Sequence, residues 1–159
     1  MTVIIVTGTP GTGKSYVSGL IQGHIGFERI DVNKLIEENN LCDDYDEQRQ
    51  CKIIDIDKTV KILMNIIKKG NFVVDSHFIH HIPVNKIDLC IVTKCDIKIL
   101  KQRLDSRGYS QKKVRENLDA EIFDICLTEA EEQDHNILII DTTNINDEEI
   151  IDKIKEKIK

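Results

Sequence analysis

The chain has 159 residues, of which 40% are hydrophobic and 31% are charged, a balance typical of a folded domain and not of a disordered chain. A formal net charge of −6 and an aromatic content of 4% argue against a protein that binds nucleic acid over its whole surface. The five cysteines show no metal-ligand spacing, so we expect reduced thiols in a cytoplasmic protein. No apolar run approaches the length of a membrane-spanning helix, so we expect no membrane contact. A monomer is the default expectation for the oligomeric state.

The first half of the chain alternates apolar runs with amphipathic stretches. In chain order, it is predicted to contain a strand at 3–7, a helix at 14–22, a strand at 27–31 and helices at 32–38 and 53–69. Residues 39–52 are polar and acidic, and predict a loop. The helix at 53–69 repeats apolar residues at helical spacing and ends before Gly70, a residue that commonly follows helix ends.

The second half continues the same alternation. It is predicted to contain strands at 72–75 and 89–93, a helix at 97–106, one long helix at 110–133, a strand at 137–141 and a final helix. Asp96 and Asn146 are suitable N-cap residues for two of these helices. Because strands that alternate with helices form parallel sheets, the sequence predicts an α/β fold with three layers (α/β/α), a five-stranded parallel sheet and one domain over 1–159.

A phosphate-binding motif lies between the first predicted strand and the first predicted helix. Residues 8–15 match the pattern G-x-x-x-x-G-K-[ST] at every fixed position. Such a loop turns backbone N–H groups toward nucleotide phosphates, while its lysine adds a positive charge and its hydroxyl can bind Mg²⁺. We therefore expect ATP with Mg²⁺ to bind at Gly8, Gly11, Thr12, Gly13, Lys14 and Ser15.

A second group for Mg²⁺ is expected to be an acid at the end of a buried strand near this loop. Asp75 follows the apolar run 72–74 and is the first candidate, holding the metal through a water molecule. Asp141 and Asp31 follow other predicted strands, and the same reasoning keeps them as alternatives.

A histidine lies two residues after Asp75. If the strand continues, His77 and Asp75 share one face, and His77 could orient a water or a substrate hydroxyl. The alternative is a histidine that packs beneath a loop. Together with His80 and His81 the pair also forms a possible zinc set, but a phosphate loop with its own Mg²⁺ explains the region better.

Five segments occur in a fixed order along nearly the whole chain. They are Thr7-Gly8-Thr9-Pro10-Gly11-Thr12-Gly13-Lys14-Ser15, Asp44-Tyr45-Asp46-Glu47, Val74-Asp75-Ser76-His77, Arg103-Leu104-Asp105-Ser106-Arg107-Gly108-Tyr109 and Glu116-Asn117-Leu118-Asp119-Ala120-Glu121-Ile122. This set resembles the adenylate kinase isoenzyme 6 family, atypical adenylate kinases that also act in maturation of the small ribosomal subunit. The short C-terminal end is similar to that of archaeal members.

The resemblance implies a nucleoside monophosphate kinase with a core, a monophosphate-binding segment at 31–54 and a short lid at 106–116. It implies that Tyr16 and Arg107 contact ATP beside the loop residues, and that Asp75 acts with His77, which is associated with hydrolysis. A small-subunit ribosomal protein or pre-rRNA is the partner that it implies.

The run 98–115 holds seven basic residues against one acid, which suits a lid that closes on a polyphosphate. Arg103 and Arg107 lie one helical turn apart in it, so both are expected to stabilise the transferring phosphoryl group.

Glu37 departs from the family pattern, because relatives usually have a basic residue at this place in the monophosphate-binding helix. An acid here would repel the phosphate of AMP. Lys34, one turn earlier on the same helix face, is the candidate substitute, and Asp31 is a second candidate for substrate contact.

Three functions remain open on the sequence. The first is adenylate kinase activity, ATP + AMP giving two ADP, with catalysis by Lys14, Asp75, His77, Arg103 and Arg107. The second is an ATPase that switches its hold on a ribosomal partner and has little AMP kinase activity. The third is a small-molecule kinase of the shikimate kinase type.

Overall fold

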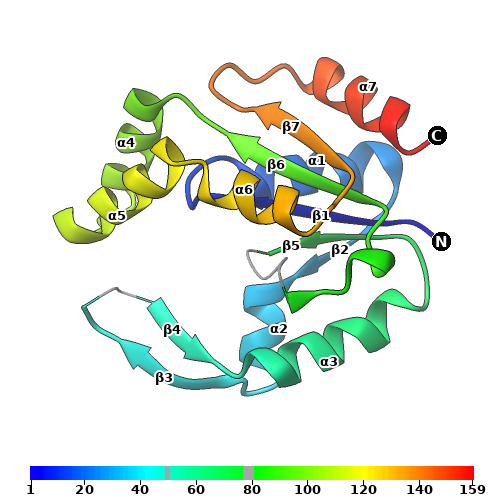
Figure 1. Ribbon diagram of the computed structural model, residues 1–159, viewed down its shortest axis with the longest axis horizontal. Coiled ribbons are helices and arrows are strands. Elements are labelled where there is room, and N and C mark those ends of the chain that lie inside the picture. The colour runs from blue at the N-terminus through cyan, green and yellow to red at the C-terminus, as the bar shows by residue number, and fades with distance from the viewer. Residues whose placement is uncertain (49–50, 77–80) are drawn as a thin grey trace.

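A parallel sheet forms the centre of the protein (Figure 1). The computed structural model describes residues 1–48, 51–76 and 81–159, and within them the sheet has five strands in the order β2-β5-β1-β6-β7. The strands are β1 (Val3–Gly8), β2 (Glu28–Asp31), β5 (Phe72–Asp75), β6 (Leu89–Lys94) and β7 (Ile137–Asp141). The predicted five-stranded parallel sheet is therefore confirmed, with β1 at its centre.

Helices cover both faces of the sheet and give the predicted three layers. On one face pack α1 (Lys14–Ile25) and α7 (Asp147–Lys157), and on the other pack α3 (Ile56–Ile67) and α6 (Ile125–Glu132). Successive residues of β1 point to opposite faces, so Ile4 packs with α1 and α7 whereas Ile5 packs toward α3 and α6. Both isoleucines are fully buried, which explains the continuous apolar runs of these strands.

Two helices extend the molecule beyond the sheet near the phosphate loop. They are α4 (Ile97–Ser106) and α5 (Gln111–Ile122), and they pack through Leu100, Leu104, Val114 and Leu118. Asp96 caps α4 as predicted, since its carboxylate accepts hydrogen bonds from the backbone N–H groups of Lys98 and Ile99. The turn between α4 and α5, with the first turns of α5, is the segment predicted as a lid.

Residues 39–52, predicted as a loop, contain two strands instead. After α2 (Val32–Glu38), β3 (Cys42–Asp46) pairs in antiparallel fashion with β4 (Cys51–Ile54), as the separate hairpin in Figure 1 shows. The side chains of Cys42, Asp43, Asp44 and Tyr45 are all exposed, so β3 buries no face and has no alternating apolar pattern. The helix predicted at 53–69 begins only at Ile56, because 53–54 belong to β4 and Asp55 caps α3.

The long helix predicted at 110–133 is also divided. It breaks between α5 and α6 at Asp124, which has a left-handed backbone (φ 52°) that aspartate tolerates better than most residues. The side chain of Asp124 pairs with the ammonium group of Lys94 at the end of β6. A contact across the fold thus stabilises a break that helical periodicity alone does not reveal.

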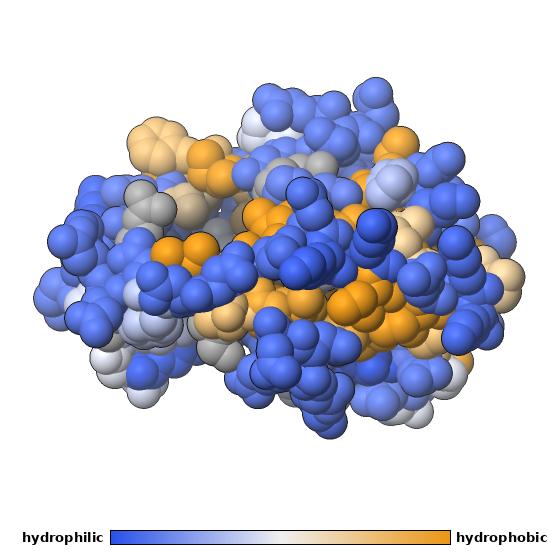
Figure 2. Space-filling model, turned by 90° about the horizontal axis from the view of Figure 1, so that it is seen from below, coloured by the Kyte–Doolittle hydropathy of each residue, from blue (hydrophilic) through white to orange (hydrophobic). Residues whose placement is uncertain are grey.

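Charged and polar side chains border most of the face seen from below (Figure 2), and hydrophobic side chains gather across its middle. A short 3-10 helix, η2 (Val84–Lys86), precedes β6. Over the part of the chain that the structure describes, no helix combines the length and the apolar character needed to cross a bilayer.

His135, between α6 and β7, makes stability depend on pH. The residue is buried, and neither ring nitrogen has a hydrogen-bond partner among the described residues. Burial lowers the pKa of His135 below its ordinary value, because the imidazolium form is desolvated. As pH falls through about 6.5, the unfolded chain takes up a proton that the folded protein resists, so stability is full above this pH and declines below it.

We therefore expect the free energy of unfolding to fall between about pH 8 and about pH 5.5, and to fall less in His135→Leu. Urea unfolding of both proteins at the two pH values measures this difference, and the other histidines cancel in the comparison. An equal pH dependence in the two proteins would contradict the prediction.

Candidate active site

Residues 8–15 join the central strand β1 to α1, as predicted for a phosphate loop. The backbone is left-handed at Gly11 (φ 90°) and at Gly13 (φ 92°), which occupies the N-cap position of α1. A Cβ atom at Gly11 would lie 2.9 Å from a methyl group of Leu100, so this backbone packs directly on α4. Only glycine meets both requirements without strain. The compact loop therefore leads directly into the first backbone N–H groups of α1, an arrangement that is suited to bind an anion.

Lys14 reaches back across this loop. Its ammonium group donates a 2.9 Å hydrogen bond to the carbonyl oxygen of Gly8. Burial lowers the pKa of Lys14 below its ordinary value, and the carboxylate of Asp75 partly opposes this shift. A desolvated ammonium group is stabilised by negative charge, so Lys14 and the N-terminus of α1 both favour a phosphate inside the loop.

Asp75 at the end of β5 lies beside the first turn of α1. Its Oδ2 accepts a 2.8 Å hydrogen bond from the Ser15 hydroxyl and a 3.1 Å ion pair from Arg29. Oxygen ligands of this kind fit a hard divalent cation such as Mg²⁺. The alternatives contact other groups, since Asp141 accepts from the backbone of Thr143 on the outer strand and Asp31 caps α2. The geometry therefore favours Asp75 as the partner of Ser15.

A cavity of about 1110 Å³ connects the phosphate loop, the segment 31–54 and the turn between α4 and α5. Among the described residues, its basic side chains are Lys14, Arg103, Arg107 and Lys113. Its acidic side chains are Asp31, Glu37, Asp75 and Glu116. The basic groups all come from the phosphate loop, α4, α5 or the turn between these helices, whereas Asp31 and Glu37 come from the opposite wall. The cavity is thus electrostatically asymmetric.

Arg103 is fixed against the phosphate loop. Its guanidinium group donates to the carbonyl oxygen of Gly11 at 3.2 Å, and to the hydroxyl and carbonyl oxygens of Thr142 at 3.1 and 2.7 Å. Arg107 is exposed and lies over the ring of Tyr109 with Lys113, whose nitrogen is 3.9 Å from the ring centroid. The two arginines are therefore brought to one cavity in different ways, Arg103 by hydrogen bonds to the backbone and Arg107 by exposed contacts with Tyr109.

The remaining predicted site residues are not all gathered here. Tyr16 lines the cavity and donates a hydrogen bond to Asp147, whereas Lys34 does not line it and points toward Glu38 at 3.9 Å. Gly8 and Thr12 help to build the loop without lining the cavity.

His77 and His80 lie outside the described residues, so the predictions that rest on them, the Asp75–His77 pair and the zinc set, are untested. Among the residues that are described, no group of three or more histidine, cysteine and acidic side chains could hold a metal ion.

Sequence reasoning missed Glu121, which supports the phosphate loop from behind. Its carboxylate is 4% exposed and accepts from the Thr9 hydroxyl at 3.3 Å, the Lys94 ammonium at 3.1 Å and the Cys95 backbone at 2.9 Å. Burial acts to lower the pKa of Lys94, but hydrogen bonds to Asp124 and Glu121 outweigh it and raise this pKa. The signal in the sequence was the spacing, because Glu121 continues the buried stripe of Val114 and Leu118.

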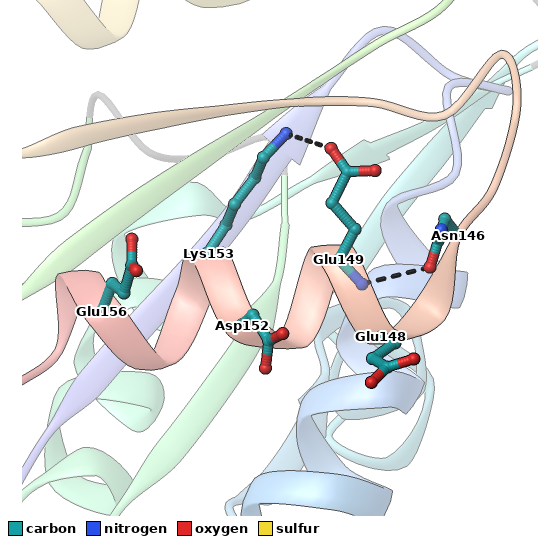
Figure 3. A pocket seen from close by; sticks show the side chains of 6 residues that line it. All are labelled: Asn146, Glu148, Glu149, Asp152, Lys153 and Glu156. Atoms are coloured by element: carbon teal, nitrogen blue, oxygen red, sulfur yellow. Dashed lines mark hydrogen bonds and ion pairs between the residues drawn. The ribbon is translucent and has the colours of Figure 1, made fainter.

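A second hollow lies along the outer side of α7 (Figure 3). Asn146 and Glu149 form the N-cap hydrogen bond there, and Glu149 pairs with Lys153 at 2.8 Å. The other side chains that line it are acids of the same helix, Glu148, Asp152 and Glu156. Because these groups come from one helix and do not converge, this hollow is a solvated helix surface and not a competing site.

Known proteins that are similar to this chain include proteins named as adenylate kinases. A family model described as an AAA domain matches residues 4–124. The chain is 38% identical to the adenylate kinase isoenzyme 6 homolog of Dictyostelium discoideum, over 92% of this chain and 85% of that protein. It is also 38% identical to a candidate adenylate kinase of Methanocaldococcus jannaschii, over 98% of this chain and 85% of that one.

Among solved structures, shikimate kinase from Acinetobacter baumannii in complex with shikimate superposes with a TM-score of 0.69. The match covers 99% of this chain and 93% of that one at 14% identity, so it shows a shared fold alone.

Proposed function

The chain belongs to the adenylate kinase isoenzyme 6 family, and we propose that it transfers the γ-phosphoryl group of ATP to AMP with Mg²⁺, forming two ADP. One observation carries this proposal: the phosphate loop, Asp75 and the basic residues of α4, α5 and their connecting turn line the same cavity as the segment 31–54. A donor and an acceptor can therefore be held next to each other in one cavity, as in-line transfer requires.

The chain's own residues supply position and charge. Lys14 and the N-terminus of α1 bind the β- and γ-phosphates, and Arg103 adds positive charge at a position fixed by Gly11 and Thr142. Arg107 reaches over the nucleotide from the turn after α4 and limits the access of water. Mg²⁺, held by Ser15 and Asp75, would neutralise charge on the phosphates.

An oxygen of the AMP phosphate forms the new bond to the γ-phosphorus while the bond to the β–γ bridging oxygen breaks. ADP is the leaving group and the acceptor becomes the second ADP, so phosphorus and charge balance. No general base is needed, because the attacking oxygen is already anionic.

A second candidate function rests on the acceptor wall. Asp31 and Glu37 line it, and among the described residues of segment 31–54 no lysine or arginine does so. Two carboxylates oppose the binding of a phosphate dianion. This observation favours an ATPase with little AMP kinase activity, for which the partner that the resemblance implies, a small-subunit ribosomal protein or pre-rRNA, would receive the effect of hydrolysis.

The two functions differ in how ADP formation responds to AMP. We expect AMP to raise ADP output from Mg·ATP many-fold, and Glu37→Arg to lower the KM for AMP by about tenfold, because an arginine replaces the repelling carboxylate with a bidentate phosphate donor. Glu38→Arg is the matched control, since it makes the same charge change one residue along, outside the cavity lining.

Output that is slow and indifferent to AMP in the wild type and in Glu37→Arg would reject the kinase and support the ATPase. An equal gain in Glu38→Arg would show that the effect is one of overall charge and not of the position of Glu37.

A further inference from the structure

Arg29 forms a largely buried ion pair with the acid proposed for the metal site. Its Nη2 lies 3.1 Å from Oδ2 of Asp75, and the two side chains are 25% and 11% exposed. The same Oδ2 accepts the hydrogen bond from Ser15 at 2.8 Å. One carboxylate oxygen of Asp75 therefore interacts both with the Ser15 hydroxyl of the phosphate loop and with the positively charged guanidinium group of Arg29.

Strand register explains how Arg29 reaches this place. β2 and β5 are parallel, with Arg29 opposite Val73 and Asp31 opposite Asp75. Val73 packs into the cluster of α1, so the alternation of side chains puts Arg29 and Asp75 on the α1 face of the sheet. Arg29 does not line the cavity. Asp75 does line it, so its carboxylate contacts Arg29 outside the cavity lining and also borders the space that a ligand would fill.

The guanidinium group is also incompletely paired. Its Nε is buried and has no hydrogen-bond partner among the described residues. A buried charge of this kind is stabilised mainly by its carboxylate, so Arg29 holds Asp75 firmly and in one orientation.

We propose that Arg29 is a positioning residue that fixes Asp75 and weakens the binding of free divalent metal at Ser15 and Asp75, so that metal enters as its nucleotide complex. The inference rests on the proposed function only in taking these two residues as the metal side of the site. Arg29 already neutralises the carboxylate and repels a second cation, so the protein alone offers a metal little net negative charge. The phosphates of a nucleotide supply that charge.

Mn²⁺ binding, followed by the loss of its free electron paramagnetic resonance signal, tests this without turnover. Without nucleotide, we expect Arg29→Gln to bind Mn²⁺ about tenfold more tightly than the wild type, since one positive charge beside the metal is removed. Arg29→Lys, which keeps the charge, is expected to bind like the wild type. Lys153→Gln on α7 controls for net charge.

The double variant Arg29→Gln/Asp75→Asn assigns the effect to this site, because it is expected to lose the gain. Binding by Arg29→Gln that is no tighter than the wild type, or a gain that survives in the double variant, overturns the inference. Melting temperatures check that each variant is folded, and Arg29→Met, which also removes the charge and is expected to show the same gain, replaces the glutamine variant if that variant unfolds.

A separate measurement tests the part of the proposed function that places the metal at Asp75. With ADP present, Asp75→Asn is expected to weaken Mn²⁺ binding, and unchanged binding would remove Asp75 from the metal site whatever Arg29 does.

Discussion

Lys14→Ala is expected to reduce ADP formation from Mg·ATP by about a hundred- to a thousandfold. Lys14 belongs to the phosphate loop, and its ammonium group is held across the loop at 2.9 Å from the Gly8 oxygen. Its removal leaves the γ-phosphate without the charge nearest to the loop. The rate is measured as ADP released over time at saturating Mg·ATP, with and without AMP.

The control for Lys14→Ala is Lys153→Ala, which removes a lysine of α7 whose partner is an exposed glutamate. This variant should retain full turnover. Because the Lys14 ammonium is desolvated, its loss is not expected to lower the melting temperature, so low activity cannot be traced to unfolding. Undiminished ADP formation in Lys14→Ala would exclude the phosphate loop from the reaction.

Glu121→Ala is expected to lower the free energy of unfolding by about 3–5 kcal/mol, a large fraction of the stability of a domain. The substitution leaves the backbone N–H of Cys95 and the hydroxyl of Thr9 without their acceptor, and it removes one of the two carboxylates that pair with Lys94. Urea unfolding measures the loss. Asp105→Ala, which breaks the exposed pair of α4 with Lys101, is expected to cost no more than about 0.5 kcal/mol.

The net contribution of the Lys94–Glu121 ion pair to stability differs from the loss caused by removing only one of its charges. Lys94→Met/Glu121→Leu removes both charges together, and is expected to be less destabilised than the sum of the single variants. Additive losses would mean that the two charges act independently, which the 3.1 Å separation of their atoms argues against.

The sequence could predict those features that local pattern determines. Strands such as Phe72–Asp75 are buried on both faces and therefore appear as continuous apolar runs, and the phosphate loop has a spacing that its backbone geometry requires. Asp96 and Asn146 act within one helical turn of their own position, so their capping roles were also predictable.

Features that depend on partners distant in the chain could not be predicted in this way. Arg29 and Asp75 are 46 residues apart, and Thr9 and Glu121 are 112 apart, so neither contact leaves a local periodicity. The hairpin of β3 and β4 escaped prediction because pairing between two strands, and not burial of one face, holds it. The placement of Lys34 away from the cavity likewise depends on how α2 is oriented by the sheet.

The role of Thr142 bears on the order in which the site is completed during protein synthesis. The Thr142 hydroxyl donates a 2.6 Å hydrogen bond to the carbonyl oxygen of Thr12, 130 residues earlier, and Arg103 reaches the phosphate loop together with Thr142. A growing chain therefore contains the complete G-x-x-x-x-G-K-[ST] motif long before Thr142 is available to form these contacts. We therefore expect the nucleotide site to reach its final form only after β7 has joined the edge of the sheet.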